Sequence, residues 1–325
     1  MQDRENQQNK DLKNQLEEWK REQLAVASQV IITDDEIASK SSNGSIQFFC
    51  PKFVTEKLLC GGVDVSFPEN ESHQSVATYV IVDPTTDVIV YQDYLYFDLK
   101  IPYLSSFLSF REIEPLEFLV KKQMRESPSF TPSVILVDGN GILHQRRAGI
   151  ACFLGVRTGV PTIGVGKKLY CEGGIQKDIV QEGIDNILLE IKSFPSKLEN
   201  AIENKENYVL IPTSQIAPNG RLPKKHDVDR AAILKDLDQM CCGIGIMLKV
   251  DSGEVIGAAL LGHGGKVGRK RRDECVAKNE IFISVGHKIS LQKSIMLCAA
   301  LSKARIPEPV RQADLWGREL LRKKN

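Results

Sequence analysis

The chain has 325 residues, 42% of them hydrophobic, which is enough for one or two domains with a substantial core. Its 43 lysines and arginines balance 42 aspartates and glutamates, so the overall charge indicates neither a nucleic-acid binder nor an acidic tail, and any such signal must be local. No apolar run approaches the roughly 20 residues that span a bilayer, and the polar N-terminus lacks the apolar centre of a signal peptide.

The eight cysteines show no metal-binding or redox pattern. They are scattered along the chain, and none belongs to a CxxC pair of the kind that zinc sites and redox motifs use. We therefore expect reduced, buried thiols. Together with the polar N-terminus, this predicts a protein of the cytoplasm or the nucleus, including the nucleolus, and we expect it to be a monomer without membrane contacts.

The N-terminus divides into a polar tail and a helix. Residues 1–10 are polar throughout, and we expect them to form a disordered tail. Leu12, Leu16 and Trp19 then recur at helical spacing. This pattern predicts a helix over residues 12–28 that packs one side against the rest of the chain.

A strand and a hairpin follow the first helix. The apolar stretch over residues 58–67 predicts a strand, and two β-branched runs within residues 77–95 flank a Pro-containing turn. Residues 111–124 then place apolar side chains on one helical face, and Pro115 is tolerable there only near the helix start.

Strands alternate with helices after the hairpin. Residues 133–138 predict a strand, residues 147–159 a helix of small residues packed tightly against it, and residues 161–169 another strand. The resulting β-β-β-α-β-α-β order is typical of an α/β protein. We therefore predict a mixed central sheet flanked by helices.

The C-terminal part continues the same alternation. Residues 241–250 and 254–262 predict a second hairpin, residues 279–304 predict a strand that leads into a helix capped near Ser290, and a last helix follows Pro309.

Two segments interrupt the domain, which we take to run over residues 11–325. Residues 193–230 are polar and punctuated by prolines, and we interpret them as an insertion. A basic loop at residues 264–278 carries five cations within seven positions, and it either contacts a nucleic-acid backbone or is a solvated, mobile loop. The five cations are Lys266, Arg269, Lys270, Arg271 and Arg272.

Three carboxylates stand at unusual places in these predicted elements. Asp64 lies in the middle of an apolar strand, where an unpaired carboxylate costs several kcal/mol, roughly, in lost hydration. Asp138 ends a second buried strand, and Glu112 begins a helix after an aromatic-rich loop. A hydrogen-bonded structural role explains any one of them. Carboxylates that converge from strand ends and a helix start instead form a hard-oxygen site suited to Mg²⁺, which favours phosphodiester chemistry.

Two basic side chains add to this interpretation. Lys167 follows a strand and a glycine, so it either faces a phosphate oxygen or is a solvated strand-end lysine. His287 also follows a strand and a glycine, just before a helix, and it either orients and deprotonates water or accepts a local backbone hydrogen bond.

Six motifs in this order closely resemble the endonuclease V family of inosine-directed nucleases. The similarity extends from about residue 12 to the C-terminus, apart from the insertion and the basic loop. The motifs are GGVDVSF, PYLSSFLSFRE, VDGNGILHQRRAGIACFLGV, PTIGVGKKL, SVGHKISL and RIPEPVRQADLWGREL.

The resemblance implies an RNase H-like fold and Mg²⁺-dependent hydrolysis, with Mn²⁺ as a substitute, at the second phosphodiester 3′ to inosine. The products are 3′-hydroxyl and 5′-phosphate ends. Asp64 and Asp138 match the family's metal-binding aspartates, and Glu112 matches the glutamate that completes the acidic centre. Lys167 falls on the catalytic lysine and His287 on the histidine near the attacking water.

The resemblance also implies a wedge and a pocket for an extruded base. Tyr103 matches the wedge tyrosine inserted where the base leaves the stack. Gly139 and Gly141 are expected to let backbone amides approach hypoxanthine, whose O6 accepts and N1–H donates, whereas the amine of adenine mismatches an amide donor. The implied pocket residues are Leu108, Gly139, Gly141, His144, Gly149 and Ile150.

The chain departs from the family pattern after the wedge. Ser105 and Ser106 stand where members usually have proline and glycine, and Gln145 stands where they usually have proline. These differences bear on the rigidity of the wedge rather than on the chemistry.

Several functions remain open at this point. The long N-terminal helix and the C-terminal motif look like the eukaryotic branch, for which inosine-containing single-stranded RNA is the implied substrate. The alternatives are a DNA repair enzyme for deoxyinosine, a non-catalytic inosine reader, and a general RNase H-like nuclease or resolvase. The reader would have lost the metal centre, and the general nuclease does not explain the wedge or the glycine pocket.

Overall fold

The structure, a computed structural model, describes residues 2–33, 47–49, 58–68, 74–99, 101–102, 104–184, 209–211, 243–261 and 280–324. Tyr103, the basic loop at 264–278 and most of the predicted insertion at 193–230 lie outside these residues.

The described strands form one mixed sheet of ten strands in the order β1-β7-β8-β9-β10-β6-β5-β2-β3-β4. On one side of it β2, β3 and β4 form an antiparallel meander, and β5 and β6 run parallel to β2. The strands are β1 (Gln47–Phe49), β2 (Cys60–Ser66), β3 (Gln74–Asp83), β4 (Val88–Asp98), β5 (Val134–Asp138), β6 (Thr162–Gly166), β7 (Val209–Ile211), β8 (Gly243–Lys249), β9 (Val255–Leu261) and β10 (Ile281–His287).

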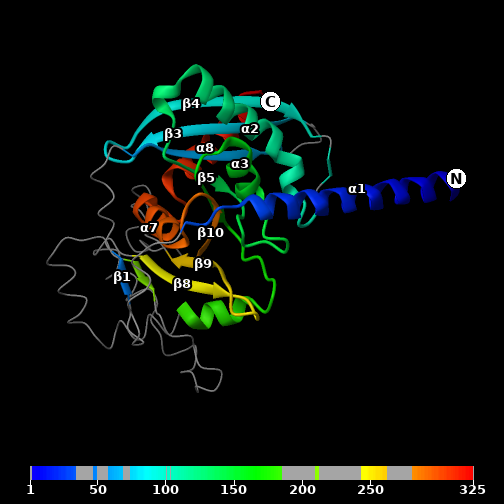
Figure 1. Cartoon of the computed structure of the whole chain (residues 1–325). Coiled ribbons are helices and arrows are strands. Elements are labelled where there is room, and N and C mark those ends of the chain that lie inside the picture. Colours follow the sequence, from blue (N-terminus) through cyan, green and yellow to red (C-terminus); the bar gives the residue numbers. More distant parts are fainter. Residues whose placement is uncertain are drawn as a thin grey trace.

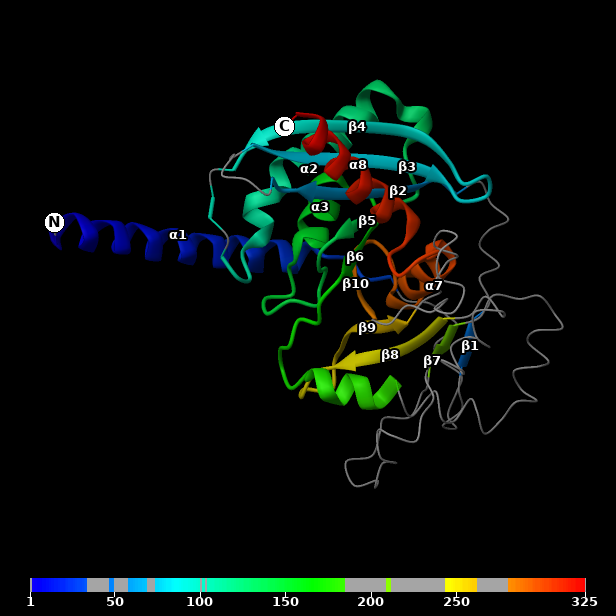
Figure 2. The same cartoon turned by 180° about the vertical axis from the view of Figure 1, so that it is seen from behind.

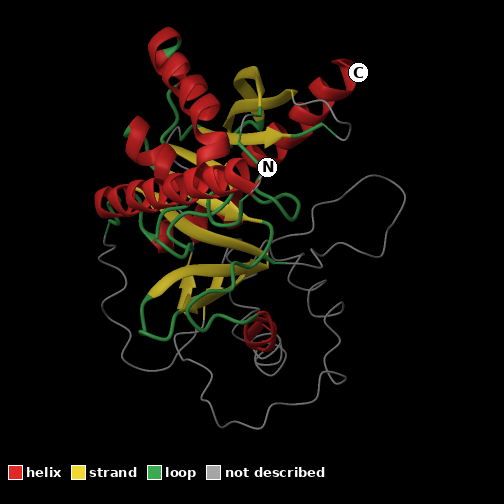
Figure 3. Ribbon diagram, turned by 90° about the vertical axis from the view of Figure 1, so that its right-hand side faces the viewer, coloured by secondary structure: helices red, strands yellow, loops and turns green. Residues whose placement is uncertain are grey.

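Helices cover both faces of this sheet, as Figures 1 and 2 show from opposite sides: α2 and α3 lie on one face, and α8 crosses β2 and β3 on the other. Figure 3 shows the helices outside the central strands. The helices are α1 (Gln2–Gln29), α2 (Leu108–Glu126), the 3-10 turn η3 (Pro128–Phe130), α3 (Ile150–Thr158), a helix over residues 177–184, α7 (Leu291–Leu301) and α8 (Glu308–Lys324). The predicted α/β fold with a mixed central sheet is therefore confirmed.

Alternation along β2 decides what α8 contacts. Side chains two residues apart on a strand share a face, so Gly62, Asp64 and Ser66 all point toward α8. A Cβ at Gly62 would lie 2.1 Å from the carbonyl carbon of Pro309, so the start of α8 packs directly on bare backbone. Farther along, a Cβ at Gly317 would lie 2.4 Å from Ser66 Oγ, so this glycine leaves room for the Ser66 side chain. These glycines bring α8 close enough for its own polar side chains to reach the end of β2.

The local predictions hold with a few differences. Ser290 accepts a hydrogen bond from the Lys293 N–H, so the predicted cap of α7 is confirmed. Helix α1 begins at Gln2 and includes most of the predicted disordered tail, because the tail is polar but contains no glycine or proline that would stop a helix. Helix α2 begins at Leu108, so Pro115 lies inside it rather than near its start.

The remaining sequence predictions concern cysteines, membranes and the insertion. Cys60, Cys152 and Cys298 are buried free thiols, whereas Cys171 is exposed. None of the helices in the described part of the chain is long and apolar enough to cross a membrane.

Within the predicted insertion, residues Val209–Ile211 form strand β7, which extends the sheet.

Candidate active site

Asp64 and Asp138 meet at the ends of two adjacent parallel strands. Val63 of β2 pairs with Val137 of β5, and the two aspartates follow directly. Asp64 is only 5% exposed, and Ser66 Oγ donates to its Oδ2 at 3.0 Å. Burial raises the pKa of Asp64 well above its usual range, and hydrogen bonding to Asp138 and the charge of Asp138 raise it further. Two carboxylates this close repel each other unless a proton or a cation lies between them.

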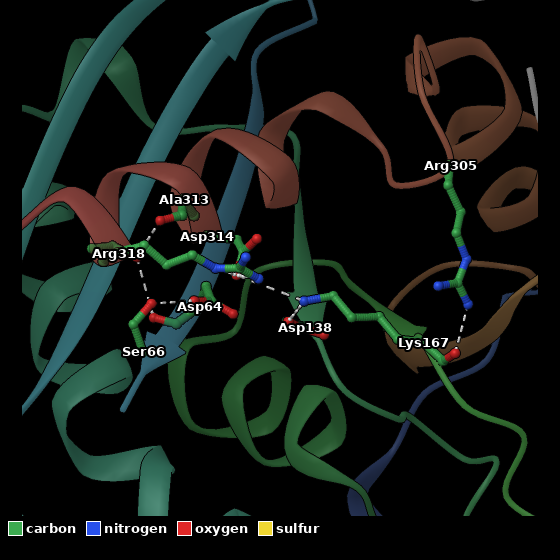
Figure 4. Close-up of polar contacts among 9 residues, drawn as sticks. Asp64, Ser66, Asp138, Lys167, Arg305, Ala313, Asp314 and Arg318 are labelled. Atoms are coloured by element: carbon green, nitrogen blue, oxygen red, sulfur yellow. Dashed lines mark hydrogen bonds and ion pairs between the residues drawn. The ribbon is translucent and has the colours of Figure 1, made fainter. Parts of the chain in front are cut away.

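Lys167 supplies one such cation. It follows directly after β6, and its Nζ lies 2.5 Å from Asp138 Oδ2. Figure 4 shows the Lys167 side chain pointing toward Asp138. Burial, the largest single effect, lowers the pKa of Lys167, but the charge of Asp138 and the hydrogen bond to it outweigh burial and raise the pKa overall. The backbone carbonyl of Lys167 accepts a hydrogen bond of 2.7 Å from Arg305 Nη2. Lys167 is therefore charged, and Arg305 fixes the position of its backbone.

Asp314 of α8 joins this cluster, although the sequence did not single it out. Its Oδ1 lies 3.9 Å from Lys167 Nζ and accepts hydrogen bonds from Nε and Nη2 of Arg318, at 3.0 and 2.8 Å. Because Ala313 and Gly317 are buried beside it, Asp314 lies at the edge of the packed face of α8. An acidic residue bordering the buried side of an amphipathic helix is the sequence signal that would have found it.

Glu112 lies at the border of the same cluster. It is in the second turn of α2 and 5% exposed. Burial raises the pKa of Glu112 to about 8, the neighbouring Arg111 opposes this, and the charge of Asp138 raises it further. Asp138 is thus within electrostatic reach of Glu112.

His287 does not join the carboxylates. It is the last residue of β10, which runs antiparallel to β6, and it pairs with Thr162 at the beginning of β6. Lys167 follows the other end of β6, so the two side chains start roughly 17 Å apart at about 3.3 Å per residue. His287 Nδ1 instead accepts a hydrogen bond of 3.2 Å from the Ile31 N–H, which attaches the segment after α1 to the sheet. Of the two roles that the sequence allowed for His287, this is the acceptance of a backbone hydrogen bond.

The donors in the cluster suit a small, hard cation. In the described part of the chain, no three His, Cys, Asp or Glu side chains are arranged to bind one metal ion. Mg²⁺ needs only one or two carboxylates, because it keeps several of its waters and takes further oxygens from phosphates. The buried, mutually repelling pair Asp64 and Asp138 provides such a two-carboxylate site.

The predicted pocket residues lie in the loop after β5 and at the starts of α2 and α3. The N–H groups of Gly139, Gly141 and Gly149 are already hydrogen-bonded inside the protein, to Val165 O, Ser284 Oγ and Gly141 O. A Cβ at Gly141 would lie 2.0 Å from Val285 O. Gly141 and Gly149 therefore serve the close packing of this loop, and their amides are not free to read a base.

The side chain of His144 is likewise engaged within the loop. Its Nδ1 accepts from the Arg146 N–H at 3.2 Å, so Nε2 carries the proton and donates to the Ser106 carbonyl at 3.0 Å. The ring stacks on Tyr170, with centroids 5.6 Å apart. Burial lowers the pKa of His144 to about 4, so the imidazole is neutral at physiological pH.

Comparison with known proteins follows the same segments. The sequence profile described as Endonuclease V matches residues 49–209 and 246–315, which include Asp64, Asp138 and Lys167. The chain belongs to the endonuclease V family. Human endonuclease V is 33% identical to it over 94% of this chain and 83% of the human protein. The mouse protein is 32% identical over 94% of this chain and 69% of its own length.

Solved structures of the endonuclease V family share the fold. The crystal structure of human endonuclease V superposes with a TM-score of 0.65 at 31% identity, covering 95% of this chain and 99% of the human one. Endonuclease V of Ciona intestinalis, solved with a 24mer DNA containing an inosine followed by a ribo-adenosine, gives 0.63 at 25% identity and covers 96% of this chain and 100% of its own. The predicted RNase H-like fold is therefore confirmed.

Proposed function

We propose that the chain is a Mg²⁺-dependent endoribonuclease that cuts inosine-containing single-stranded RNA at the second phosphodiester 3′ to inosine, leaving 3′-hydroxyl and 5′-phosphate ends. The observation that carries the proposal is the convergence of Asp64, Asp138 and Lys167 at adjacent strand ends, with Lys167 Nζ 2.5 Å from Asp138. Phosphodiester hydrolysis needs positive charge next to fixed carboxylates, and this cluster offers both.

In this proposal Asp64 and Asp138 hold Mg²⁺, and Glu112 completes the acidic centre. When bound, the ion supplies a lowered pKa for the attacking water and neutralises charge on the scissile phosphate. Ser66 orients the Asp64 carboxylate through its 3.0 Å hydrogen bond. Lys167 keeps its proton and faces the phosphate as a fixed cation, because Asp138 stabilises its charge.

The position of Asp314 gives it a supporting part in the same proposal. It lies between Lys167 and the exposed guanidinium of Arg318, so it sets the local charge on the side of the site formed by α8. His287 has no part in the reaction as proposed, since it lies at the other end of β6.

Base selection is assigned to the loop after β5 together with the segment before α2. Leu108, Gly139, His144 and Ile150 border the proposed pocket, and Tyr103 is the proposed wedge. Because the amides of Gly139, Gly141 and Gly149 are bonded internally, the hypoxanthine edge is read by other groups of the loop.

Two features support RNA as the substrate. The chain resembles the eukaryotic branch, including human endonuclease V at 33% identity. In the Ciona complex the inosine is followed by a ribonucleotide, so that relative accommodates a 2′-hydroxyl next to the inosine. The second candidate is the DNA enzyme, since the same complex is formed on a DNA strand.

The test is cleavage of matched RNA and DNA oligonucleotides that carry one inosine or none, with Mg²⁺, Mn²⁺ or EDTA, and with the cut mapped to the nucleotide. We expect cleavage of the inosine RNA only with metal. Asp64→Ala and Asp138→Ala should abolish cleavage and leave oligonucleotide binding intact, because base capture uses other atoms. Cutting only deoxyinosine DNA would establish the DNA enzyme. Equal cutting of the unmodified strand would indicate a general nuclease, and binding without cutting would indicate an inosine reader.

A further inference from the structure

A glutamine of the N-terminal helix is buried beside the segments assigned to base recognition. Gln23 of α1 is 0% exposed, and its Nε2 donates to the Ser106 carbonyl at 2.7 Å. Its Oε1 accepts a hydrogen bond from Arg146 Nε. The orientation of the amide is fixed by its partners, because a carbonyl only accepts and a guanidinium only donates.

The Ser106 carbonyl accepts hydrogen bonds from three side chains, one on α1 and two in the loop after β5. Besides Gln23, it accepts from Arg146 Nη2 at 3.1 Å and from His144 Nε2 at 3.0 Å. Ser106 itself has φ of 66°, a left-handed conformation that a side chain other than glycine or asparagine rarely adopts. Three donors on one carbonyl stabilise this conformation, which the local sequence does not favour.

The same residues connect the segment before α2 with the loop after β5. Ser106 Oγ lies 2.8 Å from the hydroxyl of Tyr170, whose ring stacks on His144. The guanidinium of Arg146 lies 4.6 Å from the centre of the Phe107 ring. Ser106 lies two residues before Leu108, so the network holds the segment that leads into α2 against the loop after β5.

Helix α1 is anchored next to Gln23. Trp19 stacks on Phe110 of α2 with centroids 4.9 Å apart, and Glu22 forms an ion pair of 2.8 Å with Arg157 of α3. Gln23 is thus presented from a helix that is fixed against both α2 and α3. The network does not include Asp64, Asp138 or Lys167.

We propose that Gln23 is a positioning residue for base recognition: through Ser106 and Arg146 it fixes the segment before α2 and the loop after β5 relative to each other. This inference rests on the proposed function, because it assigns Gln23 to the recognition of the inosine strand. Removing its hydrogen bonds should weaken substrate capture and selectivity and leave the carboxylate chemistry unchanged.

The test uses Gln23→Met, which keeps the length of the buried side chain and removes both hydrogen bonds, and Gln23→Glu, which keeps the acceptor for Arg146. Gln29→Ala is the matched control, since Gln29 is an exposed residue of the same helix whose side chain donates to the Ala25 carbonyl of its own turn. Each is assayed on inosine and guanosine oligonucleotides, with melting curves and hydrogen–deuterium exchange of residues 104–110 and 141–149.

We expect Gln23→Met to raise KM for the inosine strand about ten-fold, the size expected of one or two lost hydrogen bonds, with kcat within about two-fold of wild type. The preference of Gln23→Met for inosine over guanosine should fall, and amide exchange in both segments should rise. The values for Gln23→Glu should lie between those of wild type and Gln23→Met. Unchanged KM and selectivity in a folded variant would overturn the inference, as would a loss of kcat and melting temperature alone.

The exchange measurement does not depend on activity, so the two hypotheses fail separately. If wild type and Gln29→Ala cut no inosine strand, the proposed function is wrong, and unchanged exchange in Gln23→Met would refute the positioning role by itself.

Discussion

Replacing Gly62 by alanine should damage both the stability and the chemistry of the protein. The added Cβ would lie 2.1 Å from the carbonyl carbon and 2.2 Å from the oxygen of Pro309, where ordinary contacts begin at 3.4 Å. The obstructing atoms are backbone, so no side chain can rotate away and the start of α8 must move by about 1.3 Å. Overpacking of this kind costs about 3 kcal/mol, which corresponds to roughly 4 °C in melting temperature for a chain of this length.

The displacement also reaches the candidate site. Asp314 lies on the second turn of α8 and is 3.9 Å from Lys167 Nζ, at the limit of an ion pair. Moving α8 outward by about 1 Å breaks this contact and disturbs the side of the site that α8 forms. Misplacement by about 1 Å can cost roughly 100-fold in rate, so we expect at least about a ten-fold loss of kcat below the melting temperature.

The adjacent glycine provides the control for this prediction. The three atoms nearest to a Cβ at Gly61 all belong to side chains, at 3.0 Å (Tyr79), 3.1 Å (Ile135) and 3.3 Å (Pro132), and they can shift by a few tenths of an ångström. Gly61→Ala should therefore cost about 1 kcal/mol or less and keep its activity. Equal unfolding free energies for the two variants by chemical denaturation, or full activity of Gly62→Ala, would refute the seating of α8 on bare backbone.

Three further predictions concern single residues. Asp314→Asn keeps the shape of the side chain but removes its charge, so cleavage at saturating substrate should fall about ten-fold without a change in melting temperature. The control Glu319→Gln, on the exposed side of α8, should have no effect. Equal activities of the two variants would show that Asp314 is not part of the site. His287→Ala should lower stability, because the Ile31 N–H loses its acceptor, and should not show the roughly 100-fold loss of kcat expected of an acid–base group. Burial lowers the pKa of His144 from 6.5 to about 4, so the unfolded chain takes up a proton at this residue at a higher pH than the folded protein does. The free energy of unfolding therefore keeps its full value above pH 6.5 and falls by about 3 kcal/mol as the pH drops to 4. Chemical denaturation across this range should show a smaller pH dependence for His144→Gln than for wild type.

The elements that form the centre of the fold were predictable because their signals are local. The β-branched runs of the hairpin and the apolar run before Asp138 appear in the sequence, and the structure has strands at both. Asp64 and Asp138 attracted notice because a carboxylate in an apolar run is costly, and this cost is visible without knowing its partners. Asp314 gave a weaker signal, since its meaning depends on the packing of α8 against Gly62, which is distant in sequence.

The position of His287 could not be predicted from the residues around it. A strand ending in Gly-His and leading into a helix resembles the βα units that contain Asp138 and Lys167, and parallel strands of this kind place their ends at one edge of the sheet. Strand β10 pairs antiparallel with β6, so its last residue lies at the opposite edge. Strand direction is set by long-range pairing, which the residues around His287 do not encode. A motif can therefore match in sequence while the direction of one strand decides whether its histidine can reach the reacting atoms.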